Sequence, residues 1–167
     1  MKKIVFITLS LLLAVSFWNC EKDDICAEGT PVTPRLIIEF YDAANPTVLK
    51  SVTNLGVIEP TFTEGFGFTG VNKIQVPLRT TADITTLNFI QNGSDTDSAN
   101  DNIDAITFNY ERINEYVSRA CGYKTLFYLN DINPIELTAD GNNWIQNIEV
   151  MQPNIETENE VHVKIYF

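Results

Sequence analysis

Hydrophobic and polar residues alternate along several short stretches of the chain, and a period of two predicts β-strands. In residues 35–41, the apolar side chains Leu36, Ile38 and Phe40 fall on one face of such a strand. Similar stretches predict further strands at 49–58, 71–79, 84–91, 103–112, 116–129, 144–151 and 161–167. No window keeps a period of 3.6 residues, so we expect little helix.

These strands indicate an all-β fold. About eight strands separated by turn residues are typical of an antiparallel β-sandwich of the immunoglobulin-like, Greek-key kind. A small β-barrel is the alternative, because the pattern of side chains does not show how the sheets close. Residues 34–167 are therefore predicted to form a single β-domain.

The chain starts like a secreted protein. A basic stretch, MKK, precedes an apolar run at 4–17, which is typical of a signal peptide and short for a bilayer core of about 30 Å. Ordinary signal peptidase needs small residues at its cleavage site, but residues 17–19 read FWN. Cys20 follows directly, in the position of a cysteine that is acylated after cleavage. An uncleaved signal anchor with a free thiol is the alternative.

We therefore expect a lipoprotein signal peptide at 1–19 and a lipidated tether at 20–33. Acylation would hold the protein at a lipid bilayer without a membrane-spanning segment. The run EKDD at 21–24 resembles the export tag of surface lipoproteins in Bacteroidota-type bacteria, and a merely solvated tether is the alternative. The expected location is the outer membrane, on its periplasmic face or at the cell surface.

Charge excludes one class of partner. The chain carries a formal net charge of −11, and removal of Lys2 and Lys3 with the signal leaves −13. Nucleic acid binding requires clustered Lys and Arg, so we expect no nucleic acid partner. The same excess of acid argues against docking on anionic lipid through a basic patch.

Two cysteines remain after acylation of Cys20. In an oxidising compartment, Cys26 and Cys121 form an even pair and are predicted to be joined by a disulfide. Two buried free thiols are the alternative.

The stretch GFGFTG at 65–70 matches the letters of a dinucleotide fingerprint, but a strand pattern follows it where that fingerprint needs a helix. We interpret it as a loop in which Phe66 and Phe68 contact a partner or ligand, while Phe62 belongs to the core. The alternative is that all three rings close one end of the core.

Acidic residues gather in the polar stretch between the strands at 84–91 and 103–112. Asp95, Asp97, Asp101 and Asp104 fail the EF-hand spacing, so a solvated loop tip is expected, with a looser calcium site as the alternative. Ser98, between Asp97 and Ala99, resembles a short acceptor sequence for O-glycans. We predict no metal and no cofactor.

Nothing in the sequence indicates an enzyme. His162 is the one histidine, and the alternation of residues 161–167 predicts that it faces solvent. A nucleophile elbow of the form G-x-S-x-G is absent from the sequence. Catalytic residues are therefore not expected.

Three stretches resemble an uncharacterised family of lipoproteins from Bacteroidota-type bacteria. They read SRACGYKTLFYLND at 118–131, NNWIQNIEV at 142–150 and VHVKIYF at 161–167. The resemblance implies lipidation at Cys20 and pairing of Cys26 with Cys121, and it implies no activity or cofactor. We expect a non-enzymatic envelope lipoprotein that binds a protein partner, either an outer-membrane β-barrel protein or a component of an envelope assembly. A surface module that binds a glycan or small ligand is the alternative.

Overall fold

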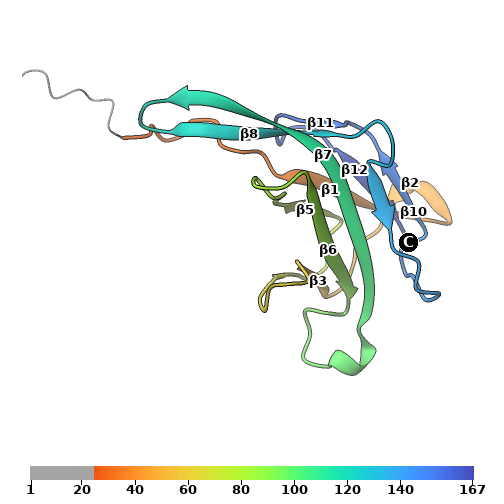
Figure 1. The fold of residues 1–167 in the computed structure, drawn as a ribbon. Coiled ribbons are helices and arrows are strands. Elements are labelled where there is room, and N and C mark those ends of the chain that lie inside the picture. Colours follow the sequence, from red (N-terminus) through yellow and green to blue (C-terminus); the bar gives the residue numbers. More distant parts are fainter. Residues whose placement is uncertain (1–24) are drawn as a thin grey trace, which may run out of the picture. The chain divides into compact units, whose positions relative to one another are not determined.

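A computed structural model of the protein describes residues 25–167 (Figure 1). The predicted signal peptide, Cys20 and the run at 21–24 lie outside the described residues. No helix in residues 25–167 has the length and apolar character needed to cross a membrane.

The described chain is built from twelve strands and one short 3-10 helix. The strands are β1 (Leu36–Asp42), β2 (Asn45–Leu49), β3 (Leu55–Ile58), β4 (Phe66–Phe68), β5 (Lys73–Val76), β6 (Ile84–Gln91), β7 (Asn102–Ser118), β8 (Gly122–Leu129), β9 (Ile135–Leu137), β10 (Asn147–Val150), β11 (Asn154–Ile155) and β12 (Val163–Tyr166). The 3-10 helix, η3, spans Ser98–Asn100.

The strands form two sheets. A five-stranded sheet has the order β10-β12-β1-β2, with β5 also paired to β1, and a seven-stranded sheet has the order β11-β8-β7-β6-β3-β4, with β9 paired to β7. Neither sheet closes on itself, so the predicted sandwich is confirmed and the barrel alternative is wrong. One pair departs from the antiparallel expectation, because β1 runs parallel to β12 with Ile38 opposite Val163.

One hydrophobic core lies between the sheets. Phe40 of β1, Phe89 of β6 and Phe108 of β7 are fully buried in it. Burial of each such side chain contributes about 1.5–3 kcal/mol to stability. The inward positions predicted for β1 are confirmed, since Leu36, Ile38 and Phe40 enter this core.

The structure corrects three strand predictions. The stretch 116–129 is broken by a turn at 119–121, after which Gly122 adopts a left-handed φ of 71° that glycine accepts without strain. The stretch 49–58 divides between β2 and β3. Phe66–Phe68, interpreted as loop, pairs with β3 as the edge strand β4.

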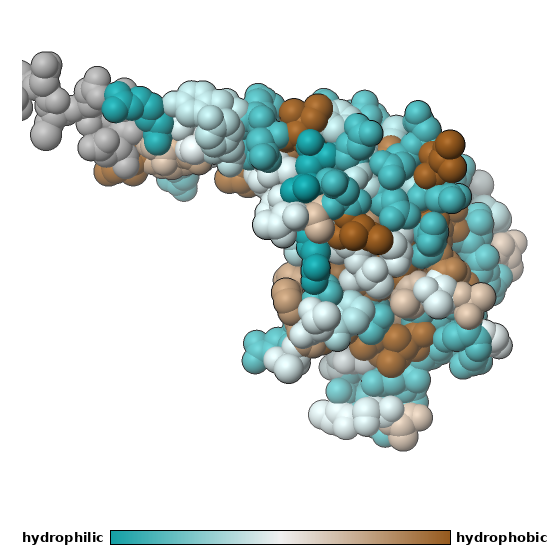
Figure 2. Space-filling view, in the orientation of Figure 1, coloured by the Kyte–Doolittle hydropathy of each residue, from teal (hydrophilic) through white to brown (hydrophobic). Residues whose placement is uncertain are grey.

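Contacts divide the chain into two compact units. We call the larger one the sandwich unit, which contains residues 31–115 and 124–167. We call the smaller one the turn unit. Its described residues are 25–30 and 116–123. None of these turn-unit residues is buried. Figure 2 shows hydrophobic residues on the drawn face as separate patches among hydrophilic ones.

Candidate binding site

A pocket of about 610 Å³ opens in the sandwich unit beside the edge strand β4. Its walls come from β3, β4, β6 and the segment that follows β5. The apolar side chains that line it are Val57, Ile58, Phe62, Phe66, Pro77, Leu78 and Leu87. Polar side chains of Glu59, Glu64, Arg79 and three threonines complete the wall. A volume of this size lies within the range of small-ligand pockets, roughly 300–1,000 Å³.

Gly65 brings the chain into the pocket wall. A Cβ atom at this position would lie 2.5 Å from the carbonyl oxygen of Val57 and 2.8 Å from the Cβ of Ile58. Any larger residue would therefore push the chain away from β3. The close approach leads directly into β4 and places Phe66 in the wall of the pocket.

The three phenylalanines near β4 have different environments. Phe62 is 63% exposed and Phe66 is 51% exposed, whereas Phe68 is half-buried and packs against the core. The prediction that Phe62 belongs to the core is wrong, because Phe62 lies in the connection beyond the end of β3. The rings of Phe66 and Phe68 stack with centroids 6.4 Å apart, so Phe68 supports Phe66 from the core side.

A closed ring of hydrogen bonds fixes the backbone of Arg79. Its N–H donates to Oγ1 of Thr85 over 2.9 Å, and its carbonyl accepts from the hydroxyl of Tyr110 over 2.9 Å. The hydroxyls of Thr85 and Tyr110 lie 2.6 Å apart. Because Tyr110 gives its one proton to Arg79, Thr85 donates to Tyr110. Thr85 and Tyr110 are buried, and burial raises the pKa of Tyr110.

The guanidinium of Arg79 pairs with Glu59, at 2.8 Å between Nη2 and Oε1. The pKa of Glu59 is lowered, first by the hydrogen bond from Thr61 and then by the charge of Arg79. The pocket wall therefore holds an ionised acid beside a cation on a fixed backbone. Such a pair orients a ligand that carries polar groups next to an apolar part.

A second groove of about 550 Å³ lies between β4 and β5. Phe66 and Pro77 line both cavities, and the second one also contacts Arg35 and Lys73. Within residues 25–167, β4 and β5 have no strand paired to their outer edges. Phe66 thus stands between two concave surfaces and forms part of the wall of each.

The acidic residues of the β6–β7 hairpin do not come together as a site. The two strands predicted on either side of the polar stretch are confirmed, and they pair as a hairpin with a connection at 92–101 that includes η3 (Figure 1). Asp95 accepts from the N–H of Asp97, and Asp97 accepts from the N–H of Ala99. Ser98, the predicted O-glycan acceptor, is exposed in η3. In residues 25–167, no three or more His, Cys, Asp and Glu side chains are grouped as metal ligands.

Asp104 differs from the other acids of this hairpin because it is fully buried in β7. Its two carboxylate oxygens accept from the backbone N–H groups of Trp144 and Ile145, over 3.4 Å and 2.8 Å. Burial raises the pKa of Asp104. Its inclusion among possible calcium ligands is therefore wrong. It connects β7 to the segment before β10.

The prediction that His162 faces solvent is also wrong. His162 is 1% exposed, and its Nδ1 atom accepts from the backbone N–H of Ile37 over 2.9 Å. Burial lowers its pKa. The alternation of residues 161–167 fails here because His162 precedes β12, where its backbone bonds to Ile37 and Met151. His162 therefore has a structural role, because its hydrogen bonds to Ile37 join the start of β12 to β1.

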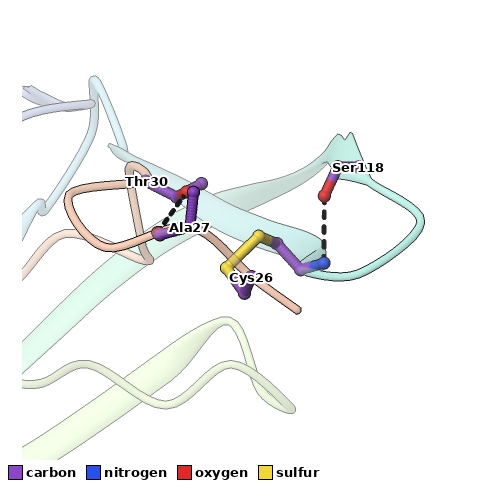
Figure 3. Close-up of a disulfide and its surroundings, with 5 residues drawn as sticks. Cys26, Ala27, Thr30 and Ser118 are labelled. Carbon is purple, nitrogen blue, oxygen red and sulfur yellow. Dashed lines mark hydrogen bonds between the residues drawn. A yellow bond between two sulfur atoms is a disulfide. The ribbon is translucent and has the colours of Figure 1, made fainter. Parts of the chain in front are cut away.

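The disulfide prediction is confirmed, because Cys26 is bonded to Cys121 with their Cα atoms 4.8 Å apart (Figure 3). Cys121 lies in the turn between β7 and β8, and its N–H donates to Oγ of Ser118 over 3.0 Å. On the other side of the bond, Thr30 donates twice to the carbonyl of Ala27. The segment after residue 25 is thus linked covalently to a hydrogen-bonded turn.

A family of unknown function, DUF6452, matches residues 62–167. The chain belongs to this family. The match to DUF6452 starts at Phe62 and includes β4 to β12, so it contains Phe66, Arg79 and Tyr110 but not β3. Neither the comparison with curated proteins nor that with solved structures finds a match.

Sequence reasoning singled out Phe66 and Phe68 but missed the residues that build the rest of the pocket. Arg79 lies 31 positions from Tyr110 in the chain, and no local sequence pattern predicts their contact. A signal was present at Tyr110, because a tyrosine at an inward position of a strand needs a partner for its hydroxyl. That signal identifies a buried hydrogen bond without naming the partner.

Proposed function

We propose that this protein is a non-enzymatic lipoprotein of the bacterial cell envelope that binds a protein partner. The exposed ring of Phe66, standing between two concave surfaces in the sandwich unit, is the observation that carries the binding role. Aromatic residues are enriched at the centres of protein interfaces, where they provide large contact area at low entropic cost. In this proposal an apolar side chain of the partner enters the pocket beside Phe66.

The proposed partner is an outer-membrane β-barrel protein or a component of an envelope assembly. Support comes from the expected anchor at Cys20, which would keep the domain at the outer membrane of a Bacteroidota-type cell. The excess of acid favours a partner surface that carries basic groups. Tethering to the same membrane raises the effective concentration of such a partner without adding any contact.

Binding of a glycan or small ligand is the second candidate. It is favoured by the ion pair of Arg79 and Glu59 in the wall of an apolar pocket. Charged groups of this kind fix the orientation of a polar ligand, while aromatic rings cover its apolar face. The same residues would serve both candidates, so the ligand has to be identified directly.

Native purification separates the two candidates. The protein is cross-linked in cells, solubilised in mild detergent and analysed by mass spectrometry. We expect one membrane or envelope protein in a fixed ratio to the lipoprotein, and no change of melting temperature with a panel of saccharides. Recovery of the lipoprotein alone, together with saccharide-dependent stabilisation, would favour the second candidate and contradict the first.

The anchor has its own test. Replacement of Cys20 by alanine should abolish labelling with a clickable fatty acid and release the protein from the membrane fraction. Cys26→Ala serves as the control, because it removes a different cysteine and should leave labelling unchanged. Retained labelling in Cys20→Ala would contradict acylation at this residue.

A further inference from the structure

The turn unit carries aromatic and aliphatic side chains in solvent, and none of its described residues is buried. Ile25 is 83% exposed, Tyr123 is 69% exposed and Tyr116 is 54% exposed. The two tyrosine rings pack edge to face, with centroids 5.4 Å apart. All three residues belong to the same compact unit and flank the bonded cysteines in sequence.

The position of these residues along the chain limits their distance from the expected anchor. Six residue steps separate Cys20 from Cys26, and a chain of this length spans at most about 20 Å. Because the disulfide holds the Cα of Cys121 4.8 Å from that of Cys26, the distance from Cys20 to Cys121 is limited as well. With an acyl anchor at position 20, the β7–β8 turn therefore stays within a short reach of the bilayer surface.

We propose that Ile25, Tyr116 and Tyr123 form a lipid-contact patch that lies in the headgroup region of the bilayer. This inference rests on the anchor position in the proposed function. Tyrosine suits that region because its ring is apolar and its hydroxyl remains hydrated. Ile25 adds an aliphatic side chain that can enter the upper acyl region. The tether makes a bilayer the one surface that is always within reach.

Charge decides which lipid surface fits. The tether carries Glu21, Asp23 and Asp24 beside Lys22, and the turn unit adds Glu28 and Arg119, so four acids stand against two bases and the formal net charge is −2. An anionic surface repels this net negative charge. The patch therefore contacts zwitterionic headgroups, by burial of apolar surface and not by attraction to phosphate charge.

The test uses the chain from Cys20 onward, which contains every described residue, coupled through its Cys20 thiol to a maleimide lipid in phosphatidylcholine vesicles. This coupling sets the anchor position whether or not cells acylate Cys20, so failure of the acyl-label test leaves it valid. Tyr123→Trp places a fluorescent ring in the patch. Ile132→Trp is the matched control, because Ile132 is 81% exposed in the sandwich unit. Trp144 is buried and gives the same background in both variants.

Brominated phosphatidylcholine then reports contact with lipid. We expect quenching in Tyr123→Trp to exceed that in Ile132→Trp by roughly twofold or more, with a blue shift in the patch variant alone. Replacing part of the phosphatidylcholine by phosphatidylglycerol should reduce the quenching of Tyr123→Trp. Equal quenching of the two variants, no quenching of either, or stronger quenching on anionic vesicles overturns the proposal.

Discussion

The pocket in the sandwich unit and the turn between β7 and β8 both present aromatic rings to solvent, but different forces hold them. Phe66 stands on Phe68, which packs against a core of buried phenylalanines and aliphatic residues. Tyr116 and Tyr123 pack on each other in a unit that has no buried residue among those described. In the first region the core fixes the surface, and in the second a covalent bond does.

The two regions should therefore respond differently to substitution. Around the pocket, exposed rings can be removed while the core beneath them persists. In the turn unit, where none of the described residues is buried, the disulfide joins the two segments, so its loss should affect both of them at once. The following predictions test that contrast, from the largest expected effect to the smallest.

Loss of the disulfide should have the largest effect. The bonded cysteines are 95 residues apart, and in the chain-entropy model a loop of this length contributes about 4–5 kcal/mol, less any native strain. The double variant Cys26→Ser, Cys121→Ser should lose about this much free energy of unfolding, measured as a lower midpoint in urea unfolding. Cys20→Ser is the control, because it leaves the pair intact and should match the unmodified protein. Equal midpoints for all three proteins would contradict the covalent role.

Removal of the Tyr110 hydroxyl should have the next largest effect. Tyr110→Phe opens the ring of hydrogen bonds, because the proton of the buried Thr85 hydroxyl loses its acceptor and the Arg79 carbonyl loses its donor, while Thr85 still accepts from the Arg79 N–H. We expect a loss of about 1–3 kcal/mol in the free energy of unfolding. Tyr123→Phe, at an exposed tyrosine of the turn unit, should change it by less than about 0.5 kcal/mol. A similar, small change in the free energy of unfolding of both variants would show that the ring of hydrogen bonds does not hold Arg79.

The buried His162 predicts a dependence of stability on pH. Its pKa is lowered by burial, so the unfolded chain takes up a proton near pH 6.5 while the folded chain does not. Stability should be fully present above about pH 6.5 and should fall as the pH drops below it. The raised pKa of Asp104 acts in the opposite direction, and its contribution is lost as the pH rises above about 4.

Urea unfolding at about pH 7.5 and pH 5.5 measures this dependence. His162→Gln retains a hydrogen-bond acceptor but does not titrate, so its stability should change less between the two conditions. An equal change in both proteins would assign the dependence to other groups.

Much of the fold can be predicted from the sequence because local alternation decides it. The hairpin of β6 and β7 follows from two alternating stretches separated by a long polar run. The sandwich follows from the number and spacing of such stretches. Local alternation fails at β4, where glycines at 65 and 67 suggest a loop although the chain pairs with β3. The close approach of Gly65 to Val57 explains that glycine, but only the folded chain reveals it.

The candidate site was only partly predictable for the same reason. Phe66 could be singled out because aromatic residues between glycines are unusual in a core. The burial of His162 depends on Ile37, which lies 125 residues away, and the position of Arg79 depends on Tyr110. Such contacts join segments that only the sheet order brings together. Residue patterns identify which side chains need partners, and the topology supplies those partners.

The smallest effect on stability should accompany the largest effect on binding. Phe66 is half exposed, so Phe66→Ala should lower the free energy of unfolding by less than about 1 kcal/mol, whereas Phe68→Ala removes a ring that packs against the core and should cost more. Ile132→Ala is the control for an exposed apolar residue outside the pocket.

Recovery of the cross-linked partner with Phe66→Ala and Ile132→Ala, measured beside their melting temperatures, tests the binding role of the pocket most directly. We predict that both variants melt close to the unmodified protein and that Phe66→Ala alone loses the partner by roughly tenfold or more, as expected for a central interface residue. Full recovery of the partner with a normally folded Phe66→Ala protein would contradict the proposal that this pocket binds it.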